Sequence, residues 1–176
     1  MTKKTGMIKS NPNRQSGDLI IYGLIPNDLI SLREPNGYGS KGGKVGAHAH
    51  HAGVQILKYA NHPDVKAYIK DGLEHGADHF NTTITLDATT KQIDTIIEMA
   101  QRFGYVADKV VDPSYPFFVD RETAHLLDDR CIVVWDVTQD NKVLVTRNQT
   151  TFGWLLGDKT NDSIFRALVG ALRLAE

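Results

Sequence analysis

The sequence lacks several features that would place it in a specialised class of protein. It has one cysteine, Cys131, in 176 residues, which excludes an internal disulfide and a multi-cysteine zinc site. Lys and Arg total 20 against 21 Asp and Glu, so the chain is not a uniformly basic nucleic-acid binder, although a local basic face remains allowed. No apolar stretch approaches the 18 residues of a membrane span, and no apolar core follows the N-terminal lysines. We therefore expect a cytoplasmic globular protein without a membrane partner.

The first 17 residues differ in composition from the rest of the chain. They contain four basic residues, no acidic residue and no periodic apolar pattern. Such a segment is typical of a flexible tail, and its basic charge would also suit a polyanion. The remaining residues, 18–176, are long enough to form a single domain with its own core.

Apolar patterning in residues 18–176 predicts alternating strands and helices. Strands are predicted at 18–24, 81–86, 105–111 and 131–137, and helices at 43–59, 63–73, 89–103 and 161–169. This alternation favours an α/β sheet with helices on both faces and with the first three strands mutually parallel. The short link before the Cys131 strand makes that strand antiparallel to its neighbour, and 142–146 would return as a hairpin strand.

The helix at 43–59 carries the clearest chemical signal. At about 100° per residue, one polar stripe runs beside its apolar face rather than opposite it. This stripe contains Lys41, Lys44, His48, His51 and Gln55. The neighbouring positions are glycines and alanines, which let a ligand approach closely, and the free N–H groups at the helix start favour a phosphate. The alternative is an alanine-rich packed helix whose polar stripe is simply solvated.

The histidines also raise the question of a metal site. His48 and His51 could be joined by His75 and His79, which have i, i+4 spacing. However, no carboxylate stands near them in a HExxH frame, and glycines around His75 make a rigid helix there doubtful. The sequence therefore predicts no metal and no cofactor.

The segment GSKGGKVGAHAHHAGV resembles the motif of the type II peptidyl-tRNA hydrolases, which occur in archaea, eukaryotes and some phages. Lys44 matches the lysine that opens the family's first helix, and His51 matches the histidine. Asp112-Pro113-Ser114 stands where the family has Asp-Ala-Gly, and GALRL at 170–174 is similar to the family's C-terminal ending. The order of elements from residue 18 to residue 137 also fits.

The sequence departs from the family pattern in three places. His48 replaces the family's glutamine, and the Thr-Gln that follows the aspartate in the family is absent at the matching place. That threonine is often assigned a catalytic or water-holding part. Residues 26–43 and 139–158 look like insertions. The chain is thus expected to be a divergent member, phage-encoded or otherwise.

The resemblance implies a three-layer α/β/α fold with a mixed, mostly parallel four-stranded sheet, which a C-terminal hairpin could extend. It implies metal-independent hydrolysis of the ester of peptidyl-tRNA, with tRNA as the partner, while homodimerisation stays open. The expected catalytic residues are Lys44, Asp112 and His48. The expected substrate-binding residues are Lys41, His51, Gln55 and Ser114. The missing Thr-Gln leaves a non-catalytic RNA-binding or regulatory module as the alternative.

The two principal catalytic candidates are far apart in sequence. Lys44 begins a helix, and Asp112 is expected to end a strand. Because such ends converge at the carboxyl edge of an open α/β sheet, we expect Lys44 and Asp112 to face one crevice with His48 at its wall.

Overall fold

A computed structural model describes residues 18–29, 43–74 and 81–175. Its α-helices are α1 (Gly43–Gln55), α2 (Pro63–Glu74), α3 (Thr90–Arg102) and α4 (Ser163–Val169), with 3-10 turns η1 (Ile56–Tyr59) and η3 (Ala124–Leu126). Its strands are β1 (Leu19–Pro26), β2 (Thr83–Ala88), β3 (Val106–Asp120), β4 (Cys131–Gln139), β5 (Lys142–Asp158) and β6 (Arg173–Leu174). In the described part of the chain, no helix is long and apolar enough to cross a membrane.

The strands form one mixed sheet in the order β3-β5-β1-β2-β6, with β4 also pairing with β5. The predicted α/β class is confirmed, but the predicted mostly parallel, four-stranded sheet is wrong. The described residues contain six strands, and β1–β2 is their one parallel pair. Strands β1, β2 and β3 do run in the same direction, and β4 is antiparallel to its neighbour, as expected. The insertion of antiparallel β5 between β1 and β3 makes most neighbouring pairs antiparallel.

Strand β5 is the main correction to the expected fold. Residues 139–158 looked like an insertion, yet β5 occupies the middle of the sheet, between β1 and β3. Every residue from Gln149 to Asp158 is buried. A central strand covered on both faces carries a continuous apolar run instead of alternation, which explains why Phe152–Leu156 did not show a strand pattern.

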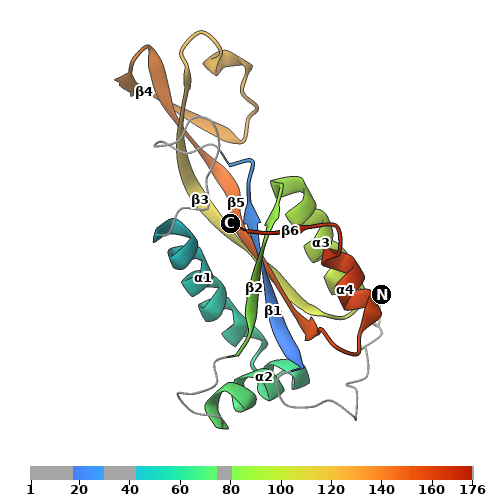
Figure 1. Ribbon diagram of the computed structural model, residues 1–176. Coiled ribbons are helices and arrows are strands. Elements are labelled where there is room, and N and C mark those ends of the chain that lie inside the picture. The colour runs from blue at the N-terminus through green and yellow to red at the C-terminus, as the bar shows by residue number, and fades with distance from the viewer. Residues whose placement is uncertain (1–17, 30–42, 75–80, 176) are drawn as a thin grey trace, which may run out of the picture.

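Helices cover both faces of the sheet (Figure 1). The α1 face packs α1 and α2 against a core that includes Ala52, Ile56, Val65, Val110 and Trp154. The α3 face packs α3 and α4 against Ile93, Ile97, Phe165 and Leu155. We use these two names below for the two sides of the sheet. The expected three-layer arrangement is therefore present.

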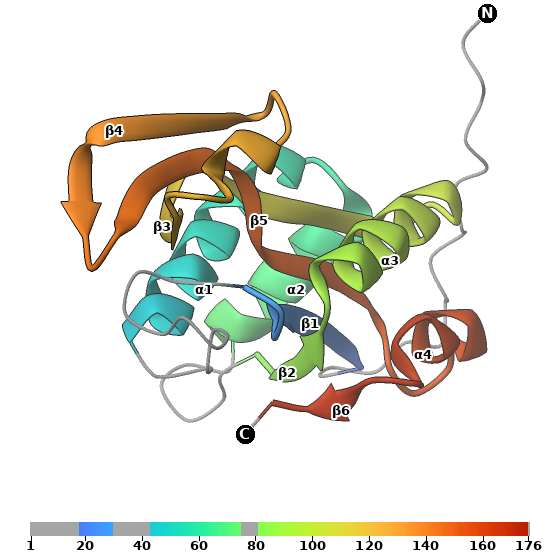
Figure 2. The ribbon, with the colours of Figure 1, turned by 90° about the horizontal axis from the view of Figure 1, so that it is seen from above.

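Strands β3 and β5 continue beyond the end of β1, and β4 pairs with β5 there. We call residues 115–147 of this extension the arm, which projects away from α4 in Figure 2. The arm has its own apolar cluster, formed by Tyr115, Phe117, Ala124, Val143 and Val145 with Leu29. Its β4–β5 turn uses Asp140 and Asn141 at φ 48° and 61°, the left-handed pair of a tight hairpin. The predicted C-terminal hairpin is thus confirmed, although its second strand is far longer than expected.

Candidate active site

Helix α1 is anchored to the sheet by the side chain of Gln55. The Gln55 Nε2 donates to the carbonyl oxygen of Lys109 at 3.1 Å, and its Oε1 accepts from Trp154 Nε1 at 3.1 Å. Trp154 is only 1% exposed, so its indole N–H needs this partner. Gln55, which was expected to bind substrate, therefore has both ends of its amide occupied within the protein.

About two turns closer to the helix start, His48 contacts the sheet. Its Nδ1 lies 3.3 Å from the hydroxyl oxygen of Thr151 on β5. The same hydroxyl donates to the carbonyl oxygen of Val110 on β3, also at 3.3 Å. His48 is half-buried, whereas Thr151 is 1% exposed. The imidazole of α1 is thereby linked to β5 and to β3 at the point where these two strands pair.

Two irregularities distort the β3–β5 ladder at this point. Val110 pairs with Phe152 while Val111 pairs with Thr150, so Thr151 is an extra residue on β5. Asp112 pairs with Gln149 and Tyr115 pairs with Arg147, which leaves an extra residue on β3. Such bulges re-aim side chains and are frequent beside active sites.

Asp112 lies between these two bulges. Strand β3 does not end at this residue, as the sequence suggested, but continues to Asp120 because the bulge accommodates Pro113, which has no N–H to donate. The carboxylate accepts from the backbone N–H of Ser114 at 2.9 Å and is half-buried. Burial and the neighbouring Asp112 charge both raise the pKa of Tyr115 above its ordinary value, burial being the larger cause. Asp112 thus presents a negative charge at the junction of body and arm.

The order of contacts shows which way α1 lies on β3. Tyr59, which follows α1 in η1, donates to Asp108 at 3.1 Å, Gln55 reaches Lys109, and His48 reaches the Val110 level through Thr151. The helix is therefore antiparallel to β3, and its first turn points toward the Asp112 end. Val110 packs on the α1 face, and Asp112 follows it by two residues on β3, beyond the first bulge.

The expected site residues consequently fall into three groups. His48 contacts β5 on the α1 face, Asp112 lies on β3 just beyond the strand position that Thr151 reaches, and exposed Ser114 adjoins Asp112. His51 is exposed, with its ring centroid 6.1 Å from that of His48. Lys44 lies in the first turn of α1, but its side chain and all of Lys41 lie outside the described residues.

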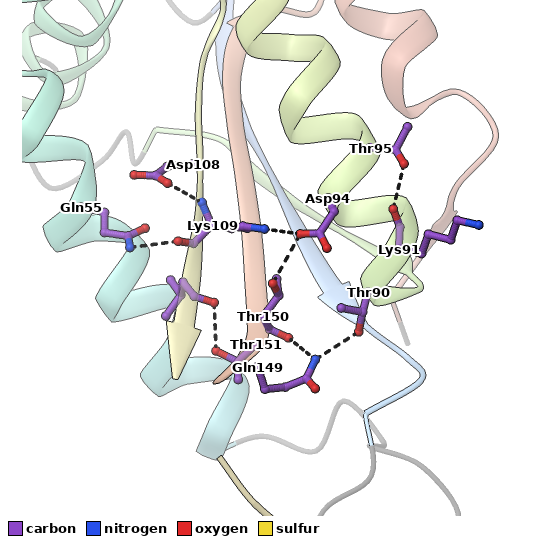
Figure 3. Close-up of polar contacts among 11 residues, drawn as sticks. Gln55, Thr90, Lys91, Asp94, Thr95, Asp108, Lys109, Gln149, Thr150 and Thr151 are labelled. Carbon is purple, nitrogen blue, oxygen red and sulfur yellow. Dashed lines mark hydrogen bonds and ion pairs between the residues drawn. The ribbon is translucent and has the colours of Figure 1, made fainter. Parts of the chain in front are cut away.

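A second polar network on the α3 face was missed by the sequence reasoning (Figure 3). Thr90 begins α3 and donates through its N–H and its hydroxyl to Asp28 at 2.7 and 2.8 Å. The Gln149 Nε2 lies 3.5 Å from the Thr90 hydroxyl oxygen. The Thr150 hydroxyl donates to Asp94 at 3.4 Å, and the Asp94 carboxylate also pairs with Lys109. The signal that could have revealed it is the run of three polar residues at 149–151, directly before an apolar segment.

A histidine metal site would need a set of His, Cys, Asp or Glu side chains arranged around one ion. Among residues 18–29, 43–74 and 81–175, no group of three or more His, Cys, Asp or Glu side chains is placed to hold a metal ion. His75 and His79, which would have completed the set, lie outside this part of the chain.

Comparison with protein-family models, with curated proteins and with solved structures found no match to this chain.

Proposed function

We propose that this protein hydrolyses the ester bond of peptidyl-tRNA, releasing peptide and free tRNA, in the cytoplasm and without a metal. The single observation that carries this proposal is the placement of His48, Asp112 and Thr151. His48 on α1 contacts Thr151 on β5, Thr151 reaches the Val110 carbonyl on β3, and Asp112 follows Val110 by two residues on that strand. The sequence resemblance assigned the first two residues to the site, whereas Thr151 was not foreseen.

The chemistry requires few protein groups. An aminoacyl ester is already reactive, so a positioned water, a base and a stabiliser of the developing oxyanion suffice. Asp112 would orient or deprotonate the water. Lys44, in the first turn of α1, would stabilise the oxyanion or a terminal phosphate. His48 would donate or accept a hydrogen bond where the resembled family has an amide.

Thr151 answers the main objection raised by the sequence. The threonine that the resembled family carries shortly after its aspartate is absent after Asp112. The pairing of Asp112 with Gln149 nevertheless brings a threonine hydroxyl, two residues after Gln149, into contact with His48. A hydroxyl at this place supports a hydrolytic role over a purely binding one.

The substrate would also need local positive charge, because the whole chain carries a net charge of −1. Lys44 and Lys41 precede or begin α1, and four further basic residues lie in the first 17 positions. A local patch is sufficient to attract a polyanion. Exposed His51 and Ser114 would contact the 3′ end of the tRNA at the rim of the site.

The deciding experiment measures release of labelled peptide from purified peptidyl-tRNA, with and without a chelator. We expect turnover that the chelator does not affect. Binding of tRNA without turnover would replace this proposal by the regulatory RNA-binding module. Loss of turnover on chelation would replace it by a metal-dependent hydrolase.

A further inference from the structure

We propose that Thr151 is a positioning residue that holds neutral His48 in the Nδ1–H form, so that Nε2 is the nitrogen that accepts the proton of the attacking water. This inference rests on the proposed hydrolytic function and deepens it. It starts from one hydroxyl that lies between two partners of different chemistry.

The direction of the two hydrogen bonds follows from the atoms involved. A threonine hydroxyl has a single proton and two lone pairs, whereas a carbonyl oxygen can only accept. Thr151 lies 3.3 Å from the carbonyl oxygen of Val110 and must donate to it. Its lone pairs then face His48 Nδ1 at 3.3 Å, so the imidazole is the donor there. In a neutral imidazole the second nitrogen, Nε2, then carries the lone pair.

The backbone places Thr151 for this task. It is the extra residue of the β5 bulge, and its side chain is turned to α1 while that of its neighbour Thr150 meets α3. At 1% exposure the hydroxyl has no access to bulk water that could reverse the bond. The branched Cβ further restricts the rotation of the side chain.

The charged and titratable groups around His48 favour a proton acceptor at this position. Asp112 lies on β3 two residues beyond Val110, whose carbonyl Thr151 reaches, and a negative charge near His48 would stabilise an imidazolium. His51 lies beside His48 on α1 itself. Residues 148–154 of β5 contain no charged side chain. Lys44 belongs to the same helix, one turn before His48.

The proposed step balances as follows. Nε2 takes one proton from a water while the water oxygen bonds to the ester carbonyl carbon. The bond from that carbon to the ribose oxygen then breaks, and the imidazolium returns the proton to the leaving oxygen. Because Nδ1 keeps its proton throughout, the hydrogen bond to Thr151 is the same in both protonation states of His48.

The test compares Thr151→Val, which is nearly isosteric but has no hydroxyl, with Thr151→Ser, which keeps one. Long-range proton–nitrogen NMR spectra of histidine-labelled protein distinguish protonated from bare ring nitrogens, and His48→Gln identifies the His48 signals. We expect Nδ1–H in the wild type and in Thr151→Ser at alkaline pH, and loss of this preference in Thr151→Val. Thr150→Val, on the opposite face, should leave the His48 signals unchanged.

The catalytic readout uses the same variants. Thr151→Val should lower kcat by at least about tenfold with KM unchanged, and Thr151→Ser should restore most of it. An inflection of the pH–rate profile between about pH 5 and 8 should be present in the wild type and absent in His48→Gln. An Nε2–H form in wild-type protein would overturn the inference. If Nδ1–H is found but peptidyl-tRNA is not hydrolysed, the proposed function fails while the positioning by Thr151 is supported.

Discussion

The α1 face and the α3 face of the sheet divide three consecutive polar residues of β5, Gln149–Thr151, between them. On the α3 face, Gln149 and Thr150 join a network that ties the start of α3 to Asp28 and Asp94. On the α1 face, Thr151 meets an imidazole on a helix whose outer positions are exposed. The polar residues of one face therefore join α3 to β5, whereas Thr151 on the other face contacts a half-buried histidine.

The glycines of β5 and those of α1 also differ in how closely they are packed. A Cβ built at Gly157 would lie 2.4–2.7 Å from the ring of Phe165 on the α3 face, and one built at Gly153 would lie 2.5 Å from Ile93. On α1, Gly46 and Gly53 have nothing within 4 Å of such a Cβ. Close packing thus explains the strand glycines, including Gly23, where a Cβ would lie 2.7 Å from Phe152 on the α1 face, but not the two glycines of α1.

The largest expected effect separates the faces by activity. Under the proposed function, Asp112→Asn and Lys44→Ala should each lower the rate of peptide release by about a hundredfold or more, because each would remove a charge that the proposed reaction uses. Asp94→Asn changes a carboxylate on the α3 face and should leave the rate unchanged. Wild-type rates in Asp112→Asn, with the fold verified by circular dichroism, would reassign Asp112 to a structural role.

Replacing a glycine of β5 and a glycine of α1 by alanine should change the free energy of unfolding in opposite directions. Gly157→Ala should lower the free energy of unfolding by about 1–3 kcal/mol, since the Phe165 ring is fully buried and must shift. Gly46→Ala should raise it by about 0.5–1 kcal/mol through helix propensity alone. Urea unfolding of both variants measures the difference. Equal effects of the two substitutions would remove the contrast in packing.

The anchor of α1 provides a finer comparison within the α1 face. Gln55→Leu should cost about 1–3 kcal/mol, because the indole N–H of Trp154 and the carbonyl of Lys109 both lose their partner. We expect the KM for peptidyl-tRNA to remain close to that of the wild type. A raised KM with unchanged stability would show instead that Gln55 binds substrate.

The smallest expected effect concerns alkaline pH and the α3 face. Tyr105 donates to Asp162 at 2.6 Å, and burial together with this bond and charge raises the pKa of Tyr105. The folded protein keeps this proton where the unfolded chain loses it, near pH ~10. The stabilisation is therefore complete below about pH 10 and declines as the pH rises further.

Tyr105→Phe should accordingly lose less stability than the wild type between about pH 9 and 11. Part of the decline should remain, because burial also raises the pKa of Tyr59, Tyr68 and Tyr115. Urea unfolding at several pH values tests this, and identical slopes in both proteins would contradict it.

The sequence predicted the helices well because each has a local signal. The helix at 89–103 is amphipathic, and the structure adds a capping box between Thr89 and Gln92 and a stop at Gly104 with φ 86°. The strand β5 was missed because its buried half lacks alternation. Asp112 was predicted to end a strand, although a bulge carries β3 past Pro113 and Ser114 to Asp120.

The candidate site was predictable only where its residues lie on one helix. The position of His48 beside the core face followed from helical spacing, but its contact with Thr151 depends on the pairing of β3 with β5. The arm separates Asp112 from Thr151 along the chain, so no local pattern joins them. Which strand is central is a property of the whole sheet, and no short segment encodes it.

The position of β5 also determines when this protein can fold during synthesis. Leu19 pairs with Asp158, so β1 emerges from the ribosome long before its antiparallel partner exists. Until then β1 can pair only with β2, and β3 exposes the edge that β5 will cover. Closure of the sheet must await almost the entire chain, and such distant pairings slow folding. Ribosome-bound chains that end before residue 142 should therefore remain sensitive to protease, whereas the complete chain becomes resistant.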